Sequence, residues 1–235
     1  MSTKTAHLDD EYFNVLNPEI HAFQISLMSM NEDYIRNCET NTPTPQERLE
    51  FIKLLKSKGF WVSIRIQPMA SLDEAKEVVK QCSGIVDYIT VEHIKIGNDN
   101  SNKKDIFKMF NLNPDDFFSS GREYEIKTEI KRKNIEELKA LSSCPIGCGD
   151  NDLHELSDSN NCCGIDTINE NFNNWIKYNA MYIRQTGDKT QWYPKNNCSS
   201  CINCEGRKSG YFFKDYVDEY IEAPQKYGKC KVKLD

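Results

Sequence analysis

An α/β fold with parallel strands, arranged as part of a (β/α) TIM-type barrel, is the architecture that the sequence predicts. Three apolar segments, 21–29, 60–69 and 85–96, have the composition of buried strands, and helices are predicted between them at 44–59 and 71–84. Near-continuous apolar strands that alternate with helices are typical of parallel strands covered by helices. About three parallel βα units do not close a barrel, so an edge stays exposed unless a partner chain, an oligomer contact or a local segment covers it.

The two predicted helices carry clear start and stop signals. The first has Thr44 as a possible N-cap, Pro45 in its first turn and Gly59 at its end. The second begins with a capping box formed by Ser71 and Glu74. These signals fix where the strands before and after each helix must begin and end.

After residue 96 the apolar pattern weakens. A polar linker leads to a short helix predicted within 103–118, a strand at 123–130 and a helix at 131–142. Two further helices are predicted near the carboxyl terminus, at 168–183 and 211–223.

The residues from 144 to 165 are rich in Cys, Gly, Asp and Asn and have little apolar periodicity. Something other than a hydrophobic core must therefore order them, and a metal is the usual solution. We accordingly predict a partial barrel domain at 1–142 and a Cys-rich, mainly helical metal- or cluster-binding extension at 143–235.

Composition limits the binding partners and the cellular locations that are expected for this protein. The net charge is -6 and the basic residues are spread along the chain, which argues against a generally basic nucleic-acid binder. No apolar run approaches the ~20 residues that span a bilayer, and the polar, acidic amino terminus does not resemble a signal peptide. A cytoplasmic location is expected, where ten cysteines act as thiols and metal ligands rather than as disulfides.

The strongest local motif is a cysteine triplet, Cys198, Cys201 and Cys204. Two-residue spacers let successive thiolates converge on one metal centre, and the register matches the first part of the C-x2-C-x2-C-x3-C run of iron-sulfur proteins. The fourth position of that run is Lys208. A fourth ligand must come from elsewhere, and the same thiolates would also satisfy zinc.

Further thiols stand in the other Cys-rich segment and could complete that site. They could clip the two ends of the 144–165 loop. They are Cys144, Cys148, Cys162 and Cys163.

Polar side chains gather at the predicted carboxyl ends of the three strands, where α/β sheets place their sites. Hydroxyl, guanidinium, carboxylate and ammonium groups together suit a polar ligand with carboxylate and amino groups, although each residue singly could form a salt bridge across the sheet end. The candidates are Ser26, Ser29, Arg65, Gln67, Glu92, His93 and Lys95.

Several segments resemble the carboxyl-terminal part of radical S-adenosylmethionine (SAM) proteins, in the branch related to spore photoproduct lyase. The similar segments are 24–69, 91–95, 147–166 and 208–220, and the first contains the typical pattern E-x-x-T-P-x-P-x-x-R-L from Glu39 to Leu49. The resemblance implies a partial barrel, a 4Fe-4S cluster and SAM lying across the strand ends. It places Ser26 and Ser29 near the SAM carboxylate or the substrate, Arg65 near SAM, and Glu92 and Lys95 near the substrate or the adenosyl group.

The chain departs from that family at its amino-terminal side. The family binds its catalytic cluster through a C-x3-C-x2-C motif after the first strand, yet no cysteine precedes Cys38 here. We therefore expect a carboxyl-terminal portion of a radical SAM-like iron-sulfur protein, not competent alone and with an auxiliary cluster or zinc. Lyase- or transferase-like activity would need a separately encoded amino-terminal half.

The alternative that the sequence leaves open is a zinc- or cluster-stabilised binding module. Its partner would be a protein or, by analogy with the family, a nucleic acid. No membrane partner is expected.

Overall fold

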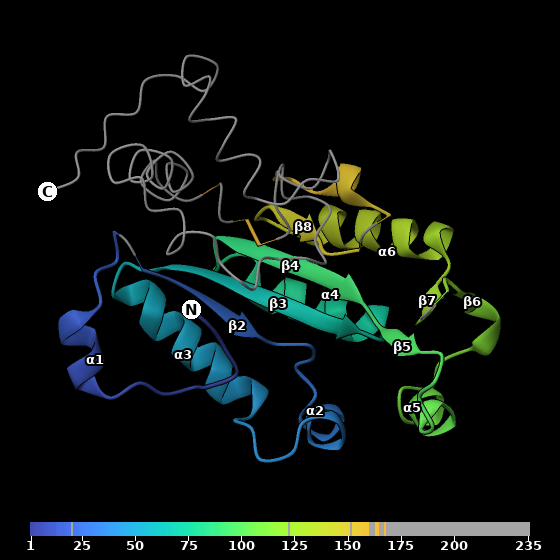
Figure 1. The fold of residues 1–235 in the computed structure, drawn as a ribbon. Helices are drawn as coiled ribbons and strands as arrows, with labels where there is room; N and C mark the ends of the chain where they lie inside the picture. Colours follow the sequence, from blue (N-terminus) through green and yellow to red (C-terminus); the bar gives the residue numbers. More distant parts are fainter. Residues whose placement is uncertain (20, 122, 151, 160–162, 165–166, 168–235) are drawn as a thin grey trace, which may run out of the picture. The chain divides into compact units, whose positions relative to one another are not determined.

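The computed structural model describes residues 1–19, 21–121, 123–150, 152–159, 163–164 and 167. The chain divides into two compact units, Met1–Gly164 and Ile165–Asp235, and the fold reported below is that of the first. Its main feature is a five-stranded parallel sheet with the strand order β1-β2-β3-β4-β8 (Figure 1). The α/β class and the parallel arrangement predicted from the sequence are confirmed.

Three consecutive crossovers build the centre of this sheet. The strands are β2 (Ala22–Ser26), β3 (Trp61–Met69), β4 (Tyr88–His93) and β8 (Ile146–Cys148). The helices that connect them are α3 (Pro45–Ser57), α4 (Leu72–Cys82) and α6 (Thr128–Leu141). The three predicted strands and both predicted helices of the first half are therefore present.

Capping explains why these helices begin where the sequence indicated. The Thr44 hydroxyl accepts a hydrogen bond from the Glu47 backbone N–H, and the Glu47 carboxylate accepts one from the Thr44 N–H, which forms a complete capping box. Ser71 accepts from the Glu74 N–H at the start of α4. Gly59 ends the first helix region with φ +84, a left-handed conformation that glycine adopts without strain.

Two strands of the parallel sheet were not predicted from the sequence. β1 (Ser2–Thr3) pairs in parallel with β2 at Gln24 and Ile25, and so a local segment covers part of the edge that was expected to be exposed. β8 is a further parallel strand, in addition to the three predicted ones. It lies within the segment assigned to the extension at 143–235, and the first compact unit runs to Gly164.

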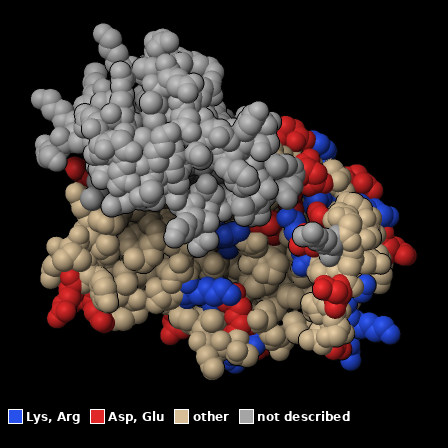
Figure 2. All heavy atoms as spheres, viewed as in Figure 1, with Lys and Arg blue, Asp and Glu red and all other residues tan. Residues whose placement is uncertain are grey.

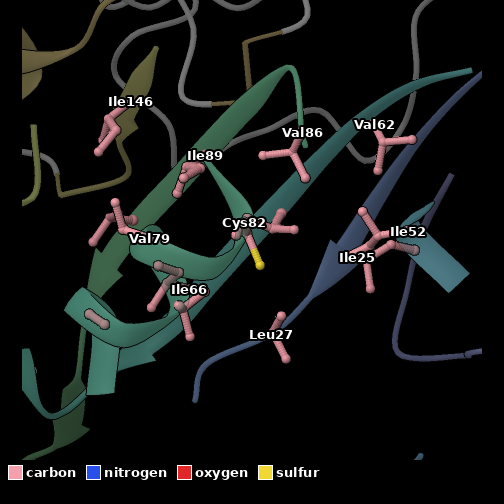
Figure 3. Close-up of a cluster of buried hydrophobic side chains, with 14 of the residues drawn as sticks. Ile25, Leu27, Ile52, Val62, Ile66, Val79, Cys82, Val86, Ile89 and Ile146 are labelled. Atoms are coloured by element: carbon pink, nitrogen blue, oxygen red, sulfur yellow. The ribbon is translucent and has the colours of Figure 1, made fainter. Parts of the chain in front are cut away.

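One face of the sheet packs on the helices and forms the core. The side chains of Ile25, Val62, Ile66 and Ile89 point toward this layer, together with Ile146 from β8 (Figure 3). All five are fully buried. From the helices, the apolar positions of α3, α4 and α6 supply the other side of the core; they include Ile52, Leu55, Val78, Val79, Cys82, Ile135 and Leu138.

A small antiparallel sheet is inserted between β4 and α6. Its strand order is β5-β7-β6, formed by Lys95–Gly97, Glu123–Ile126 and Phe117–Ser119. A separate cluster that includes Ile96, Phe117 and Ile126 is buried there. The remaining elements are α1 (Asp10–Val15), α2 (Glu32–Cys38), α5 (Lys103–Met109), η1 (Pro114–Asp116) and η2 (His154–Leu156).

The strap, here defined as residues 150 and 152–158, follows β8 and is ordered by hydrogen bonds and ion pairs. It closes the outer edge of β8, because the Asp158 carboxylate accepts from the Ile146 N–H at 2.8 Å and the Ser157 hydroxyl accepts from the Cys148 N–H at 2.7 Å. Three ion pairs fasten it to α6. They are Lys131–Asp152, Arg132–Glu155 and Lys139–Asp158.

The face of the sheet opposite the helices is covered near the start of β4. Gly164 lies against the ring of Tyr88, since a Cβ at Gly164 would stand 2.4 Å from that ring. The Tyr88 hydroxyl is 2.5 Å from the Ser159 hydroxyl, and its ring stacks on Trp61. The other end of this face, at the carboxyl ends of the strands, holds the polar side chains described next.

Among the helices that the structure describes, none is both long and apolar enough to span a membrane. The helices predicted at 168–183 and 211–223 lie outside the described residues, as does the triplet Cys198, Cys201 and Cys204.

Candidate functional site

Alternation along the strands places a polar row on the sheet face opposite the helices. Ser26 of β2 is in register with Arg65 of β3, and Arg65 is in register with Thr90 of β4. Because register partners in a parallel sheet share a face, these three side chains lie side by side. Glu92 is two residues beyond Thr90 and therefore on the same face, at the carboxyl end of β4.

Glu92 is the centre of the candidate site. One of its carboxylate oxygens accepts from Arg65 Nη2 at 3.1 Å and the other accepts from Lys95 Nζ at 3.1 Å. The Glu92 and Lys95 side chains are 16% and 17% exposed and that of Arg65 is 33% exposed, so the group is sheltered but open to a ligand. The structure thus brings together three of the residues predicted to bind a cofactor.

The charge of Glu92 raises the pKa of Lys95. Burial lowers the pKa of Lys95, but attraction to Glu92 and the hydrogen bond between them more than offset this, and the pKa lies above its ordinary value of 10.5. Lys95 is therefore an ammonium group at neutral pH. The site presents two cations on either side of one carboxylate.

Gly149 explains why the Glu92 side chain can lie beside the end of β8. A Cβ at Gly149 would stand 2.9 Å from the Glu92 Cβ and 3.0 Å from one carboxylate oxygen. The Gly149 N–H donates to the Val91 carbonyl at 2.7 Å, so the two chains are also joined there. Any larger residue at position 149 would push the carboxylate away from its partners.

One hydrogen-bond donor of the Arg65 guanidinium, Nε, is buried and has no hydrogen-bond partner among the residues that the structure describes. A buried donor without a partner is costly, so a ligand oxygen that accepted from it would be favoured. A carboxylate or hydroxyl next to Arg65, and an amino group next to Glu92, would match this arrangement.

The remaining predicted ligand residues are distributed differently. Gln67 lies on the same face of β3 as Arg65 and is half-buried. The Ser26 carbonyl accepts from Arg48 Nη1 at 2.8 Å, which fixes the end of β2. Ser29 is fully buried, donates to the Glu74 carboxylate and accepts from the Asn31 N–H, so it joins β2 to α2 and α4 and does not belong to the Glu92 group.

His93 points to the other face of the sheet, toward α6, and forms a buried pair with Asp150. The distance between its Nδ1 and Asp150 Oδ2 is 2.6 Å, and the two side chains are 1% and 0% exposed. Burial alone would raise the pKa of Asp150, but the hydrogen bonds from His93 and the charge of Lys131 hold it below its ordinary value. Strand alternation could have placed His93 on this face, whereas no local signal identified Asp150.

The cysteines of the described segments do not converge on a metal. Cys144 precedes β8 and Cys148 ends it, and four residues of extended chain span about 13 Å, far more than two ligands of one ion bonded at about 2.3 Å allow. Burial, reinforced by Asp150, raises the pKa of Cys148 to about 12. In the described part of the chain no group of three or more His, Cys, Asp or Glu residues could hold a metal ion.

The segment that follows residue 143 was predicted to be ordered by a metal, but its first part is ordered in another way. Ion pairs and the edge of β8 order its first part, which had been expected to need a metal. Among the described residues the thiols form no group of three that would hold a cluster or zinc by itself. The metal site of Cys198, Cys201, Cys204 and Cys162, which lie outside the described residues, stays a prediction, and so does a fourth ligand from Cys144, Cys148 or Cys163.

Changing Cys144 and Cys148 to Ser together should leave the metal content of the purified protein unchanged. The two thiols lie too far apart to share an ion, so their loss removes no ligand pair. Inductively coupled plasma mass spectrometry would measure iron and zinc per chain, with Cys201→Ser as the matched variant, which should lower the content. A fall in metal with the double variant that matches that of Cys201→Ser would contradict the geometry.

Comparisons with known proteins found structural similarity only. Protein-family profiles and curated sequences gave no match. A solved structure described as "Spore photoproduct lyase complexed with dinucleoside spore photoproduct" is similar with a TM-score of 0.41 and 16% identity, covering 59% of this chain and 45% of that one. A cysteine-to-serine mutant of spore photoproduct lyase is similar with a TM-score of 0.40 and 15% identity, over the same shares of the two chains. The chain thus spans less than half the length of either structure.

Proposed function

We propose that the first unit binds a small zwitterionic ligand at the carboxyl ends of β3 and β4, with SAM as the leading candidate. The observation that carries this proposal is the Glu92 carboxylate held between Arg65 and Lys95. A ligand with both carboxylate and amino groups needs donors and an acceptor side by side, and this site offers both. The resemblance of segments 24–69 and 91–95 to radical SAM proteins supports the choice of SAM.

The residues present suit such a ligand without further groups. The Arg65 Nε can donate to a ligand carboxylate, and Glu92 can accept from a ligand ammonium group while Lys95 limits the net negative charge. When bound, SAM would supply an activated sulfonium centre. Arg65 and Glu92 would orient it, and the backbone of β8 at Gly149 would hold Glu92 in place.

Titration calorimetry with SAM tests the site. We expect Glu92→Gln to raise the dissociation constant about tenfold, because one charge-assisted hydrogen bond to the ligand is worth about 1.5–3 kcal/mol. Glu50→Gln is the matched control, since Glu50 lies on the exposed face of α3 and pairs with Lys53. Equal affinity in wild type and Glu92→Gln, or no binding to the wild type, would overturn the proposal.

We further propose that this chain represents a portion of a radical SAM-type barrel that cannot cleave SAM by itself. The described cysteines fit no cluster, so a separately encoded half, or a second copy of the chain, would have to contribute along β1, which covers β2 at only two positions. Anaerobic reconstitution with iron and sulfide, followed by chromatography of the nucleoside products, should show bound but uncleaved SAM. Cleavage of SAM by this chain alone would refute the proposal that the chain needs a second component.

A second candidate is a zinc- or cluster-stabilised module that binds a macromolecule. The sequence feature that favours it is that no C-x3-C-x2-C motif, which holds the catalytic cluster of radical SAM enzymes, occurs in the chain. Figure 2 shows acidic and basic side chains next to one another on the described part of the face it draws, which suits a protein partner better than a phosphate backbone. Salt-sensitive retention on immobilised nucleic acid would favour a nucleic-acid partner over a protein partner.

A further inference from the structure

Glu92 and His93 are neighbours on β4 that point to opposite faces of the sheet. Glu92 lies with Arg65 and Lys95 on the ligand face, whereas His93 is buried beneath α6. The buried residue is therefore one peptide bond away from the centre of the proposed site. What holds His93 must also influence where Glu92 lies.

Asp150 holds His93 twice. Its Oδ2 accepts from the His93 ring at 2.6 Å and from the His93 backbone N–H at 3.3 Å. Asn134 of α6 lies 3.2 Å from the other ring nitrogen, through its amide Nδ2. An amide nitrogen can only donate, so Nε2 accepts and the ring proton resides on Nδ1, where it is donated to Asp150.

Asp150 directly follows Gly149, the residue against which the Glu92 side chain packs. The Asp150–His93 bonds and the bond from the Gly149 N–H to the Val91 carbonyl clamp the ends of β8 and β4 together. If the clamp opened, Gly149 would move away from Glu92. The carboxylate would then gain freedom to leave Arg65 and Lys95.

We propose that the buried His93–Asp150 pair is a positioning pair that sets the Glu92 carboxylate from the opposite face of the sheet. It touches no ligand and acts through Gly149 and the β4 backbone. The effect that this inference expects on ligand binding rests on the proposed function. The effect that it expects on the Arg65–Glu92 contact does not depend on the identity of the ligand.

Two substitutions at position 93 separate positioning from general stability. His93→Leu removes both ring nitrogens and leaves Asp150 with the backbone N–H of residue 93 and the Cys148 thiol as donors. His93→Asn restores a side-chain donor, because its amide nitrogen is attached to Cγ as Nδ1 is. Leu138→Ala is the control, since it opens a cavity in the buried face of the same helix, α6, without removing a hydrogen bond of His93, Asp150 or Glu92. Gly149→Ala is a second route to the same displacement and leaves His93 and Asp150 intact.

Nuclear magnetic resonance of the Arg65 guanidinium gives the first readout. In His93→Leu and Gly149→Ala its protons should exchange with water about tenfold faster, the effect of losing one charge-assisted contact, whereas His93→Asn and Leu138→Ala should stay near the wild-type rate. Unchanged exchange in His93→Leu or in Gly149→Ala would overturn the proposal. So would an acceleration in Leu138→Ala as large as that in His93→Leu.

Calorimetry with SAM gives the second readout. The dissociation constant should rise about tenfold in His93→Leu and return toward the wild-type value in His93→Asn. A wild-type protein that does not bind SAM would refute the proposed function, and the exchange measurement would still decide the positioning pair. Normal Arg65 exchange in His93→Leu together with weakened SAM binding would refute the positioning pair and leave the proposed function standing.

Discussion

Replacing Arg48 with Met is expected to lower the free energy of unfolding by about 3–5 kcal/mol, the usual cost of removing one partner of a buried ion pair. The Arg48 guanidinium is fully buried and donates to the Glu39 carboxylate at 2.6 Å, to the Ser26 carbonyl at 2.8 Å and to the Pro43 carbonyl at 3.1 Å. Met fills much of the volume but removes one donor from each of these three acceptors. Urea denaturation followed by circular dichroism would measure the loss.

Arg36→Met is the matched control for Arg48. Arg36 also pairs with a glutamate, Glu32, but both side chains are largely exposed, so its loss should cost less than about 1 kcal/mol. Burial alone would raise the pKa of Glu39, but Lys4 and Arg48 hold it below its ordinary value of 4.5. The stabilisation is present above that value and is lost as the pH falls through the lower folded pKa, so the difference between wild type and Arg48→Met should narrow in acid. Equal losses for the two arginines would contradict this account.

Replacing Lys131 with Met should destabilise the first unit by a similar amount, about 3–5 kcal/mol. The Lys131 side chain is 1% exposed, and its ammonium lies 2.6 Å from Asp152 and 3.3 Å from Glu125. Met would leave two carboxylates without their partner, and the strap would lose its innermost attachment to α6. Hydrogen exchange measured by mass spectrometry should show the amides of residues 152–158 losing protection first.

Lys133→Met tests whether burial, rather than charge, produces that effect. Lys133 is on the same helix, but its side chain is 77% exposed and lies 3.9 Å from Glu137. Its replacement should change the unfolding free energy by no more than about 0.5 kcal/mol. If the strap stayed protected in Lys131→Met, ion pairing could not be what orders it.

Sequence periodicity predicted the strands and helices of the first half because each is long enough to repeat its own pattern. β3 and α4 have nine and eleven residues, and the caps at Thr44 and Ser71 mark helix starts by purely local chemistry. β1 and β8 have only two and three residues, too few to show a period, and they are strands only because a neighbour pairs with them. The two short strands and the end of the first unit could therefore not be predicted from the sequence.

The candidate site, too, was predicted only in part from the sequence. The tendency of α/β sheets to place polar sites at the carboxyl ends of their strands predicted a group that included Arg65, Glu92 and Lys95, and these three side chains are in contact. Ser29 and His93, predicted in the same group, lie elsewhere. The pattern containing Glu39 and Arg48 carried a family resemblance, yet its physical role as a buried ion pair that holds the end of β2 emerged only from the fold.

Cysteine content suggested a metal for the segment after residue 143, and the tertiary structure supplied a different agent for its first part. Lys131 and Asp152 are separated by 21 residues, and His93 and Asp150 by 57. Composition predicted that something other than an apolar core orders this segment, yet Ile146, Cys148 and Leu153 belong to the main core. Which charges meet, and that Cys148 is buried in that core, was decided by the parallel pairing of β4 with β8, because that pairing brings the two distant stretches together.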